Sequence, residues 1–338
     1  MCGIIGYIGH KNAVPVLIEG LKSLEYRGYD SAGIAYLRDS RIAVHRCAGK
    51  LTNLESSLSA TDQTSPVGIG HTRWATHGKP SEENAHPHQV NGLVLVHNGI
   101  IENYLPLKQE LEAEGRRFAS ETDTEVIVHL IDRQMIRGQD FESAVRSALK
   151  EVRGSYAICV LSESDPDILI AARDGCPLVA GLGNGESMVA SDIPPILSHT
   201  REILILEDGE MAVVNRKGVV IKDLNGKVKQ RKVQTISWTP VMAEKGGYRH
   251  FMLKEIYEQP QAVLDTFRGR VFPETGEVIL PEIGLTPEEV VGLDKITLVA
   301  CGTSYHAALI GKFLIEELAR IPVEVDIGSE FRYREPLL

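Results

Sequence analysis

Short apolar runs separated by amphipathic segments constrain the fold of this chain more than any other feature of its sequence. Four of these runs lie at residues 4–8, 92–97, 156–161 and 168–172. Successive residues in each run are mostly apolar, which is typical of strands in sheets that are covered on both faces. We therefore expect layers of helix to cover the sheets.

Two segments have the pattern of helices that could form such layers. One begins after Asn103, a residue suited to capping a helix, and carries apolar residues four apart. The other follows Thr122-x-x-Glu125, the pattern of a capping box. Further short strands are expected at residues 202–206, 210–215 and 218–221, the last two joined by a polar turn.

The strand pattern ends near residue 225, and a different organisation follows. Residues 225–285 are charged and contain several prolines, which is typical of a linker, with one helix expected near 252–267. The last segment has the pattern of one strand–helix–strand unit, with strands at 295–300 and 323–327. We expect a first domain over residues 2–220, a linker with a lead-in helix over 221–285, and an incomplete α/β domain over 286–338.

Charge and composition exclude several classes of protein. The chain has 338 residues with 36 basic and 46 acidic side chains, and the net charge of -10 disfavours nucleic acid as a partner. No apolar run approaches the roughly 18 to 20 residues that span a bilayer, and the N-terminus lacks the basic flank of a signal peptide. The five scattered cysteines have no Cys-x-x-Cys spacing. We expect a cytoplasmic protein with reduced thiols, no membrane partner and no disulfide framework.

Cys2 is the first candidate for catalysis. Removal of Met1, which a small second residue permits, leaves a thiol and a free α-amine on the same residue. An α-amine has a pKa of about 7.7 to 8.0, which suits a general base near neutral pH. The Met-Cys-Gly sequence alone favours the alternative, an ordinary buried N-terminal strand.

Three further segments carry candidate site residues, each with a structural alternative. Arg73, after a strand expected at 67–70, has a planar guanidinium that suits a carboxylate, or it forms a surface ion pair. Asn98 and Gly99 form either a hairpin turn or an oxyanion hole from the Asn98 amide and the Gly99 N–H. Asp123, expected in the first turn of a helix, either complements the helix dipole or binds an ammonium group.

Five histidines also lie close together in the sequence, at positions 71, 77, 86, 88 and 97. A metal site would be expected to show His-Glu-x-x-His or cysteine ligand spacing, and neither accompanies them. The sequence therefore predicts no metal site.

Taken together and in this order, the motifs resemble the glutaminase part of the glutamine:fructose-6-phosphate amidotransferases, also called glucosamine-6-phosphate synthases. The resemblance extends along essentially the whole chain. The motifs that carry it are CGI at 2–4, EYRGYDSAG at 25–33, HTRWATHG at 71–78, NAHPH at 84–88, HNGIIEN at 97–103, SETDTE at 120–125, YRH at 248–250, EIYEQP at 255–260, CGTS at 301–304 and SEFRYR at 329–334.

The resemblance implies a fold and a catalytic centre. The fold is an α+β four-layer α-β-β-α sandwich, that of the N-terminal-nucleophile hydrolases and class II glutamine amidotransferases, followed by a truncated α/β sugar-isomerase (SIS) domain. Cys2 would attack the side-chain amide of glutamine, and its α-amine would move the protons. Asn98 and Gly99 would hold the oxyanion.

The resemblance also assigns residues to substrate binding. Arg73 would bind the α-carboxylate of glutamine and Asp123 its α-ammonium group. Thr76 and His77 would contact the substrate from the same loop as Arg73. Trp74 would help to gate a channel that carries ammonia to the second domain.

Thr303 and Ser304 match contacts to the sugar phosphate in the second domain. A Gly-Thr-Ser turn that opens a helix offers N–H groups, two hydroxyls and a favourable dipole to an anion. The same turn also serves simply to cap helices. The site for fructose 6-phosphate is expected to be incomplete, because a complete synthase continues for several hundred residues.

The implied function is glutamine hydrolysis through a Cys2 thioester, without metal or cofactor, which supplies ammonia for the conversion of fructose 6-phosphate to glucosamine 6-phosphate. This is the first step of hexosamine synthesis, and the full-length protein is expected to be a homodimer. A non-catalytic sugar-phosphate-binding or regulatory fragment is the alternative. The purine-pathway amidophosphoribosyltransferases would need paired aspartates after an apolar strand, and asparagine synthetases a Ser-Gly-Gly loop; the sequence has neither.

Overall fold

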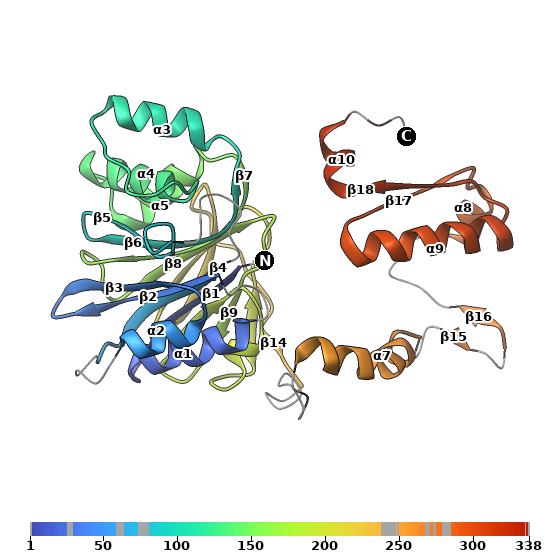
Figure 1. Cartoon of the computed structure of the whole chain (residues 1–338), viewed down its shortest axis with the longest axis horizontal. Coiled ribbons are helices and arrows are strands. Elements are labelled where there is room, and N and C mark those ends of the chain that lie inside the picture. Colours follow the sequence, from blue (N-terminus) through green and yellow to red (C-terminus); the bar gives the residue numbers. More distant parts are fainter. Residues whose placement is uncertain are drawn as a thin grey trace. The chain divides into compact units, whose positions relative to one another are not determined.

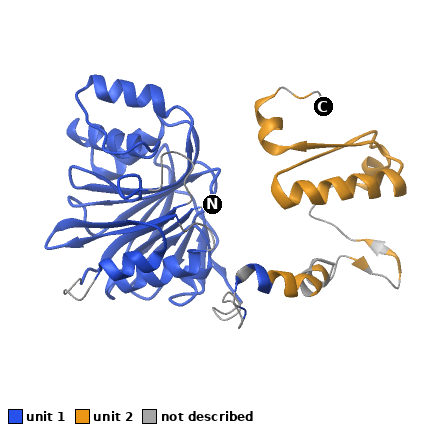
Figure 2. Cartoon of the chain, in the orientation of Figure 1, with its two compact units in different colours: residues 1–254 blue, residues 255–338 orange. Residues whose placement is uncertain are grey.

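The structure is a computed structural model of the chain. It describes residues 2–25, 30–58, 64–73, 81–237, 248, 250–267, 271–272, 275–278, 285–334 and 336. The chain divides into two compact units, Met1–Lys254 and Glu255–Leu338, which Figure 2 shows in different colours.

Unit 1 contains two sheets in which neighbouring strands pair antiparallel. The eight-stranded sheet has the order β14 (Gln234–Thr235), β11 (Glu202–Ile205), β9 (Val179–Leu182), β10 (Ser187–Ala190), β1 (Gly3–Ile8), β4 (Val67–Arg73), β2 (Ser31–Arg38) and β3 (Arg41–Ala48). The six-stranded sheet has the order β13 (Gly218–Asp223), β12 (Glu210–Asn215), β8 (Leu169–Asp174), β7 (Gly154–Ser162), β6 (Leu93–Ile101) and β5 (His88–Val90).

Helices cover the outer face of each sheet, as Figure 1 shows. Helices α1 (Ala13–Leu24) and α2 (Leu51–Ser57) share an apolar cluster with the eight-stranded sheet, and the short 3-10 helix η2 (Pro194–Ile196) packs beside α1. The six-stranded sheet is covered by α3 (Tyr104–Ala113), α4 (Glu125–Ile136) and α5 (Phe141–Leu149). The expected four-layer α-β-β-α sandwich is confirmed.

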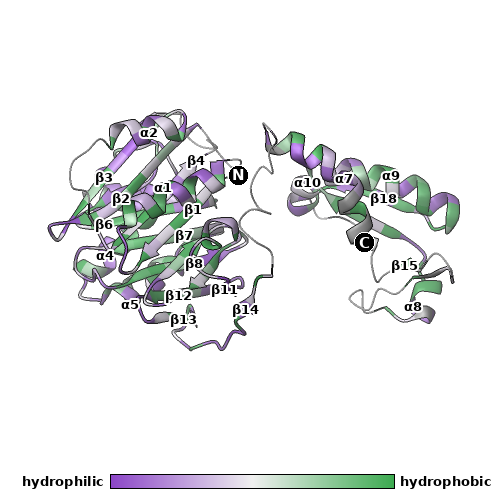
Figure 3. Ribbon diagram, turned by 90° about the horizontal axis from the view of Figure 1, so that it is seen from below, coloured by the Kyte–Doolittle hydropathy of each residue, from purple (hydrophilic) through white to green (hydrophobic). Residues whose placement is uncertain are grey.

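Alternate side chains of the central strands enter different layers of this sandwich. Ile4 of β1 lies in the cluster between the two sheets, together with Val94 and Val96 of β6. Ile5 and Tyr7 point the other way, into the cluster beneath α1. Both faces of β1 are therefore buried, which explains why its residues are apolar without interruption. Figure 3 shows the hydrophobic residues gathered along these inner strands.

Most of the expected elements are present, but the capping box before α4 is wrong. The Glu125 carboxylate accepts hydrogen bonds from the backbone N–H groups of Ala119 and Ser120, at 2.8 and 2.7 Å. Helix α4 begins at Glu125 itself, and Thr122 lies outside it. The Thr122 hydroxyl contacts His88 Nε2 at 3.0 Å instead. Glu125 thus ties the preceding loop to the helix, and Thr122 is not the residue that caps it.

Strand pairing in unit 1 continues past residue 220, where we expected the first domain to end. Strand β13 runs to Asp223, and β14 pairs with β11 through Glu202 and Thr235. The eight-stranded sheet therefore includes residues that we expected in the linker. The domain limits 2–220, 221–285 and 286–338 stay a prediction.

Unit 2 contains the expected strand–helix–strand unit. Helix α7 (Phe251–Phe267), which starts in unit 1, is followed by β15 (Val271–Phe272), β16 (Glu277–Val278), α8 (Pro287–Val291), β17 (Ile296–Ala300), α9 (Gly302–Leu318), β18 (Val323–Ile327) and α10 (Gly328–Tyr333). Strands β17 and β18 pair in parallel, with α9 as the connection between them. Of the helices that the structure describes, none is both long and apolar enough to span a bilayer.

Candidate active site

The start of β1 holds Cys2 in a fixed place at the end of the eight-stranded sheet. Gly3 pairs with Thr72 of β4, and the N–H of Ile4 donates to Ser191 Oγ at 3.0 Å. A Cβ atom on Gly3 would lie 2.7 Å from Thr72 Oγ1, so a larger residue does not fit there. The Cys-Gly pair thus lets the strand begin directly after the half-buried Cys2.

Strand β4 extends three residues beyond the end that we expected at residue 70, and it carries Arg73 as its last residue. Arg73 pairs with Ser31 of β2, and only 4% of its surface is exposed. The alternative of a surface ion pair is therefore wrong.

Asn98 and Gly99 lie inside β6, so the hairpin-turn alternative is also wrong. They pair with Ala157 and Tyr156 of β7, and the strand continues to Ile101. The φ angle of Gly99 is +128°, and a Cβ atom there would lie 2.0 Å from the backbone oxygen of Ser155. Only glycine fits this backbone conformation.

The Asn98 side chain contacts both sheets. Its Nδ2 donates to the backbone oxygen of Cys2 at 3.0 Å, and its Oδ1 lies 3.0 Å from His71 Nε2 of β4. The amide that we expected in an oxyanion hole is therefore adjacent to the candidate nucleophile.

Asp123 lies in the loop before α4. We expected it in the first turn of that helix, but α4 begins only at Glu125. Its Oδ2 accepts a hydrogen bond from the N–H of Ile101 at 2.7 Å, and the residue is 4% exposed. The end of β6 therefore fixes the position of this carboxylate.

Cys2, Arg73, Gly99 and Asp123 meet at a small cavity of about 20 Å³, enough for about one water molecule. Its lining comprises Cys2, Arg73, His86, His97, Gly99, Thr122, Asp123 and Thr124. The fold thus brings together a thiol, a guanidinium and a carboxylate from three distant parts of the chain. The two charges complement the carboxylate and ammonium groups of a free amino acid.

His86, His97, Thr122 and Thr124 line the cavity but were not among our predicted site residues. His97 Nδ1 lies 2.8 Å from Thr124 Oγ1, and the N–H of His97 donates to His86 Nδ1 at 3.4 Å. His86 adjoins no predicted site residue, and for the others the available signal was adjacency in the sequence: His97 directly precedes Asn98, and Thr122 and Thr124 flank Asp123. It could not show which of them line the cavity, because that depends on how the loop packs on β6.

Four of the five histidines noted in the sequence are buried together. The ring centroids of His71 and His86 are 4.2 Å apart, and those of His86 and His88 are 4.8 Å apart. Burial lowers the pKa of His71 and of His88 to about 3, so both are neutral at pH 7. Within the described part of the chain, no three His, Cys, Asp or Glu side chains are arranged to hold a metal ion.

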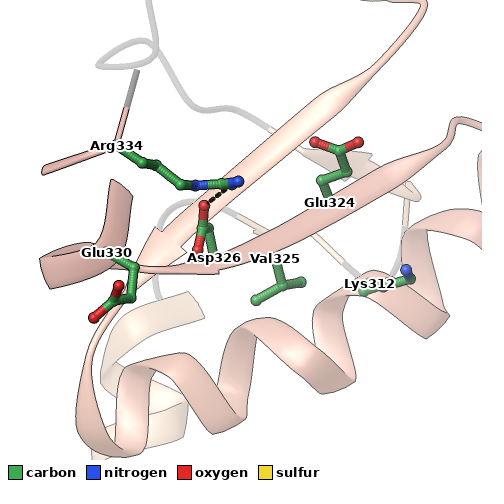
Figure 4. A pocket seen from close by; sticks show the side chains of 6 residues that line it. All are labelled: Lys312, Glu324, Val325, Asp326, Glu330 and Arg334. Atoms are coloured by element: carbon green, nitrogen blue, oxygen red, sulfur yellow. Dashed lines mark hydrogen bonds and ion pairs between the residues drawn. The ribbon is translucent and has the colours of Figure 1, made fainter. Parts of the chain in front are cut away.

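The five other predicted residues lie either outside the described residues or in unit 2. Trp74, Thr76 and His77 lie outside the described residues. Thr303 and Ser304 belong to unit 2, where both are exposed in the first turn of α9. Unit 2 also has a hollow of about 500 Å³, lined by Lys312, Glu324, Val325, Asp326, Glu330 and Arg334. Figure 4 shows the ion pair of Asp326 with Arg334 there; Thr303 and Ser304 do not line this hollow.

Comparisons with known proteins agree with this arrangement. A glutamine amidotransferase domain family matches residues 71–198, and the SIS domain family matches residues 292–338. The glutamine–fructose-6-phosphate aminotransferase [isomerizing] of Clostridium tetani is 51% identical over 340 residues, which cover all of this chain and 55% of that protein. The enzyme of the same name from Symbiobacterium thermophilum is 52% identical, covering 100% and 56%. The whole chain is thus similar to these aminotransferases. It spans about half the length of the curated relatives that it matches.

Solved structures support the fold. A glutamine phosphoribosylpyrophosphate amidotransferase from B. subtilis superposes with a TM-score of 0.59 at 25% identity, covering 96% of this chain and 65% of that chain. A structure titled as the allosteric regulatory enzyme of purine biosynthesis gives 0.60 at 26%, with the same coverage. The N-terminal-nucleophile hydrolase fold is confirmed, and the sequence is nearer to the aminotransferases than to these two proteins.

Proposed function

We propose that this chain hydrolyses glutamine at Cys2 and that the ammonia serves to convert fructose 6-phosphate to glucosamine 6-phosphate in the complete protein. The observation that carries this proposal is the cavity where Cys2, Arg73, Gly99 and Asp123 meet. Its residues supply a nucleophile, an oxyanion donor and the two charges that an amino-acid substrate requires. We infer the identity of the acceptor sugar from the names of the relatives.

The proposed reaction begins once Met1 has been removed. The Cys2 α-amine takes the thiol proton while the sulfur attacks the side-chain amide carbon of glutamine. The developing oxyanion accepts hydrogen bonds from Asn98 Nδ2 and the N–H of Gly99. The α-ammonium group then protonates the leaving nitrogen, ammonia departs and a glutamyl thioester remains. Water hydrolyses this thioester and releases glutamate.

Charge complementarity orients the substrate in this proposal. The Arg73 guanidinium binds the α-carboxylate of glutamine, and Asp123 binds the α-ammonium group. Thr76 and His77 complete the contacts, and Trp74 gates the path of ammonia, as the family resemblance implies. Each of the two charged contacts discriminates against substrates that lack the corresponding group.

The part of the chain that matches the SIS family is assigned to the sugar phosphate. Thr303 and Ser304 lie in the first turn of a 17-residue helix, where backbone N–H groups and the helix dipole favour an anion. We further infer a homodimer for the complete protein and a cytoplasmic location; both stay predictions.

Release of glutamate from glutamine tests this proposal against the non-catalytic alternative. The chain is first shown by intact mass to begin at Cys2, and glutamate is then measured with and without fructose 6-phosphate. We expect steady glutamate formation by the wild type and none by Cys2→Ala. A correctly processed and folded chain that releases no glutamate in either condition would establish the regulatory alternative.

A further inference from the structure

His71 does not line the cavity, but its side chain contacts the backbone of His97 and the side chain of Asn98. It lies on β4, two residues before Arg73, and is fully buried. Its Nε2 is 3.0 Å from Asn98 Oδ1 and 3.0 Å from the backbone oxygen of His97. Carbonyl oxygens accept hydrogen bonds and do not donate them, so the Nε2 atom must carry the proton.

The other ring nitrogen of His71 carries no proton. Burial, together with smaller contributions from the charges of His97 and Arg73, lowers the pKa of His71 to about 3, so the ring is neutral. In keeping with a bare nitrogen, Nδ1 has no hydrogen-bond partner among the described residues. The tautomer with the proton on Nε2 therefore fits both contacts of that atom and leaves Nδ1 as a bare acceptor.

This tautomer fixes the orientation of the Asn98 amide. The opposite end of that amide faces the backbone oxygen of Cys2, which can only accept, so that end must be the NH2 group. A reversed amide would set Asn98 Oδ1 against the Cys2 oxygen, and its NH2 group against the Nε2–H of His71. Both contacts would be repulsive, so His71 and Cys2 together select one orientation.

We infer that His71 is a positioning residue for the oxyanion site, because it holds the Asn98 amide with its NH2 group toward Cys2. This inference rests on the proposed function, since it concerns the same site. His71 also binds the carbonyl of His97, so it holds the backbone directly before Asn98 and Gly99. It does not line the cavity, and it therefore acts through Asn98 and not on the substrate.

Two substitutions separate this role from simple packing. His71→Phe keeps a planar ring and removes the N–H donor, whereas His71→Gln retains an N–H near the position of Nε2. We expect His71→Phe to lower kcat for glutamine hydrolysis by roughly 10- to 100-fold with KM changed less than about threefold. His71→Gln should recover most of this loss. Equal losses in the two variants would overturn the role assigned to the N–H.

The control is His199→Phe, which removes another histidine of unit 1 whose side chain is 9% exposed. His199 lies beside Glu186 and Lys11 and is absent from the cavity lining. We expect its kcat to stay within about twofold of the wild type. A loss as large as that of His71→Phe would show that kcat follows general packing of unit 1.

A double substitution tests whether His71 acts through Asn98. In an Asn98→Ala background the amide is already absent, so adding His71→Phe should lower kcat by less than about threefold more. If the two losses instead multiply in full, His71 acts independently of Asn98 and the inference is wrong.

The protonation state can be measured without any activity. In ¹⁵N-histidine-labelled protein, the signals of His71 are those lost in His71→Gln. They should show a proton on Nε2, a bare Nδ1, and no titration between pH 8 and pH 5. A proton on Nδ1, or titration near pH 6.5, would contradict the inference even if glutamate release confirms the proposed function. Conversely, a chain without glutaminase activity would refute the proposed function while this spectrum still reports on His71.

Discussion

The side-chain amide of Asn98 donates a hydrogen bond to the backbone oxygen of Cys2, with 3.0 Å between Nδ2 and O. Asn98 lies on β6 of the six-stranded sheet, whereas Cys2 directly precedes β1 of the eight-stranded sheet. One contact thus joins the two sheets where the proposed nucleophile and the proposed oxyanion donor meet. The relative position of these groups is set by the packing of the sandwich.

Asn98→Ala should lower kcat for glutamine hydrolysis by roughly 10² to 10³, because its amide binds the oxyanion most strongly in the transition state. KM should change only a few-fold. Glutamate release over a range of glutamine concentrations measures both constants. Asn53→Ala is a matched control, since Asn53 is an exposed residue whose amide binds the backbone of Ala48. A raised KM with unchanged kcat would show that Asn98 binds the substrate and not the oxyanion.

Gly99→Ala should abolish most activity, because its Cβ atom would lie 2.0 Å from the backbone oxygen of Ser155 and force β6 to move. The control is Gly138→Ala, at a φ of +91° with no atom within 4 Å of the added Cβ. That control should lower the free energy of unfolding by about 1 kcal/mol and leave kcat unchanged. Denaturant unfolding and glutamate release of the two variants provide the comparison. Wild-type activity in Gly99→Ala would refute the placement of its N–H in the oxyanion site.

Asp123→Asn tests the proposed contact with the substrate ammonium group. The amide oxygen can still accept the hydrogen bond from Ile101, so the variant removes the charge and preserves the support of β6. Loss of a charge-assisted contact worth about 2 to 3 kcal/mol predicts kcat/KM for glutamine lower by about 30- to 150-fold. Glu121→Gln makes the same change of charge at an exposed position nearby and should behave as wild type. Equal kcat/KM values in the two variants would rule out the role of Asp123.

Acid should destabilise unit 1 through its buried histidines. Burial lowers the pKa of His71, His86 and His88 far below the ordinary value of 6.5, so below pH 6.5 the unfolded chain binds protons that the folded chain does not. The free energy of unfolding should therefore fall as the pH falls from 6.5 toward 3, by about 1.4 kcal/mol per pH unit for each histidine.

Urea unfolding at several pH values between 7.5 and 5 measures this slope. His88→Gln should reduce the slope by the contribution of one histidine, about 1.4 kcal/mol per pH unit. His10→Gln, at an exposed position, should leave the slope unchanged. The slope does not depend on the stability of each variant at neutral pH. An identical slope in His88→Gln and in the wild type would show that the histidine cluster does not control acid stability.

Local patterns predicted sheets covered by helices, whereas the four-layer order came from the family resemblance. The uninterrupted apolar residues of β1 indicate burial on both faces, and the sandwich provides this by placing Ile4 between the sheets and Ile5 beneath α1. The ends of elements were harder to predict. Asn98-Gly99 is the commonest hairpin dipeptide, yet β6 continues through it because Gly99 adopts a φ of +128° while still paired with Tyr156.

For the candidate active site, the sequence likewise predicted the residues but not how they come together. Residue chemistry predicted Cys2, Arg73 and Asp123 as candidates, since a thiol, a guanidinium and a carboxylate each suit a part of an amino-acid substrate. Their meeting in one cavity depends on the register of β1 with β4 and on the hydrogen bond from Ile101 to Asp123. Those are contacts between distant segments, which no local pattern encodes.

Covalent labelling of the N-terminal residue tests the central claim most directly. The processed chain is treated with a glutamine-like electrophile, and its intact mass and N-terminal peptide are analysed, with a variant that retains Met1 as the control. The account predicts a single adduct on the Cys2 sulfur that excess glutamine suppresses, with loss of glutamate release, and no adduct in the control. Labelling confined to Cys47 or Cys176, with Cys2 unmodified, would contradict it.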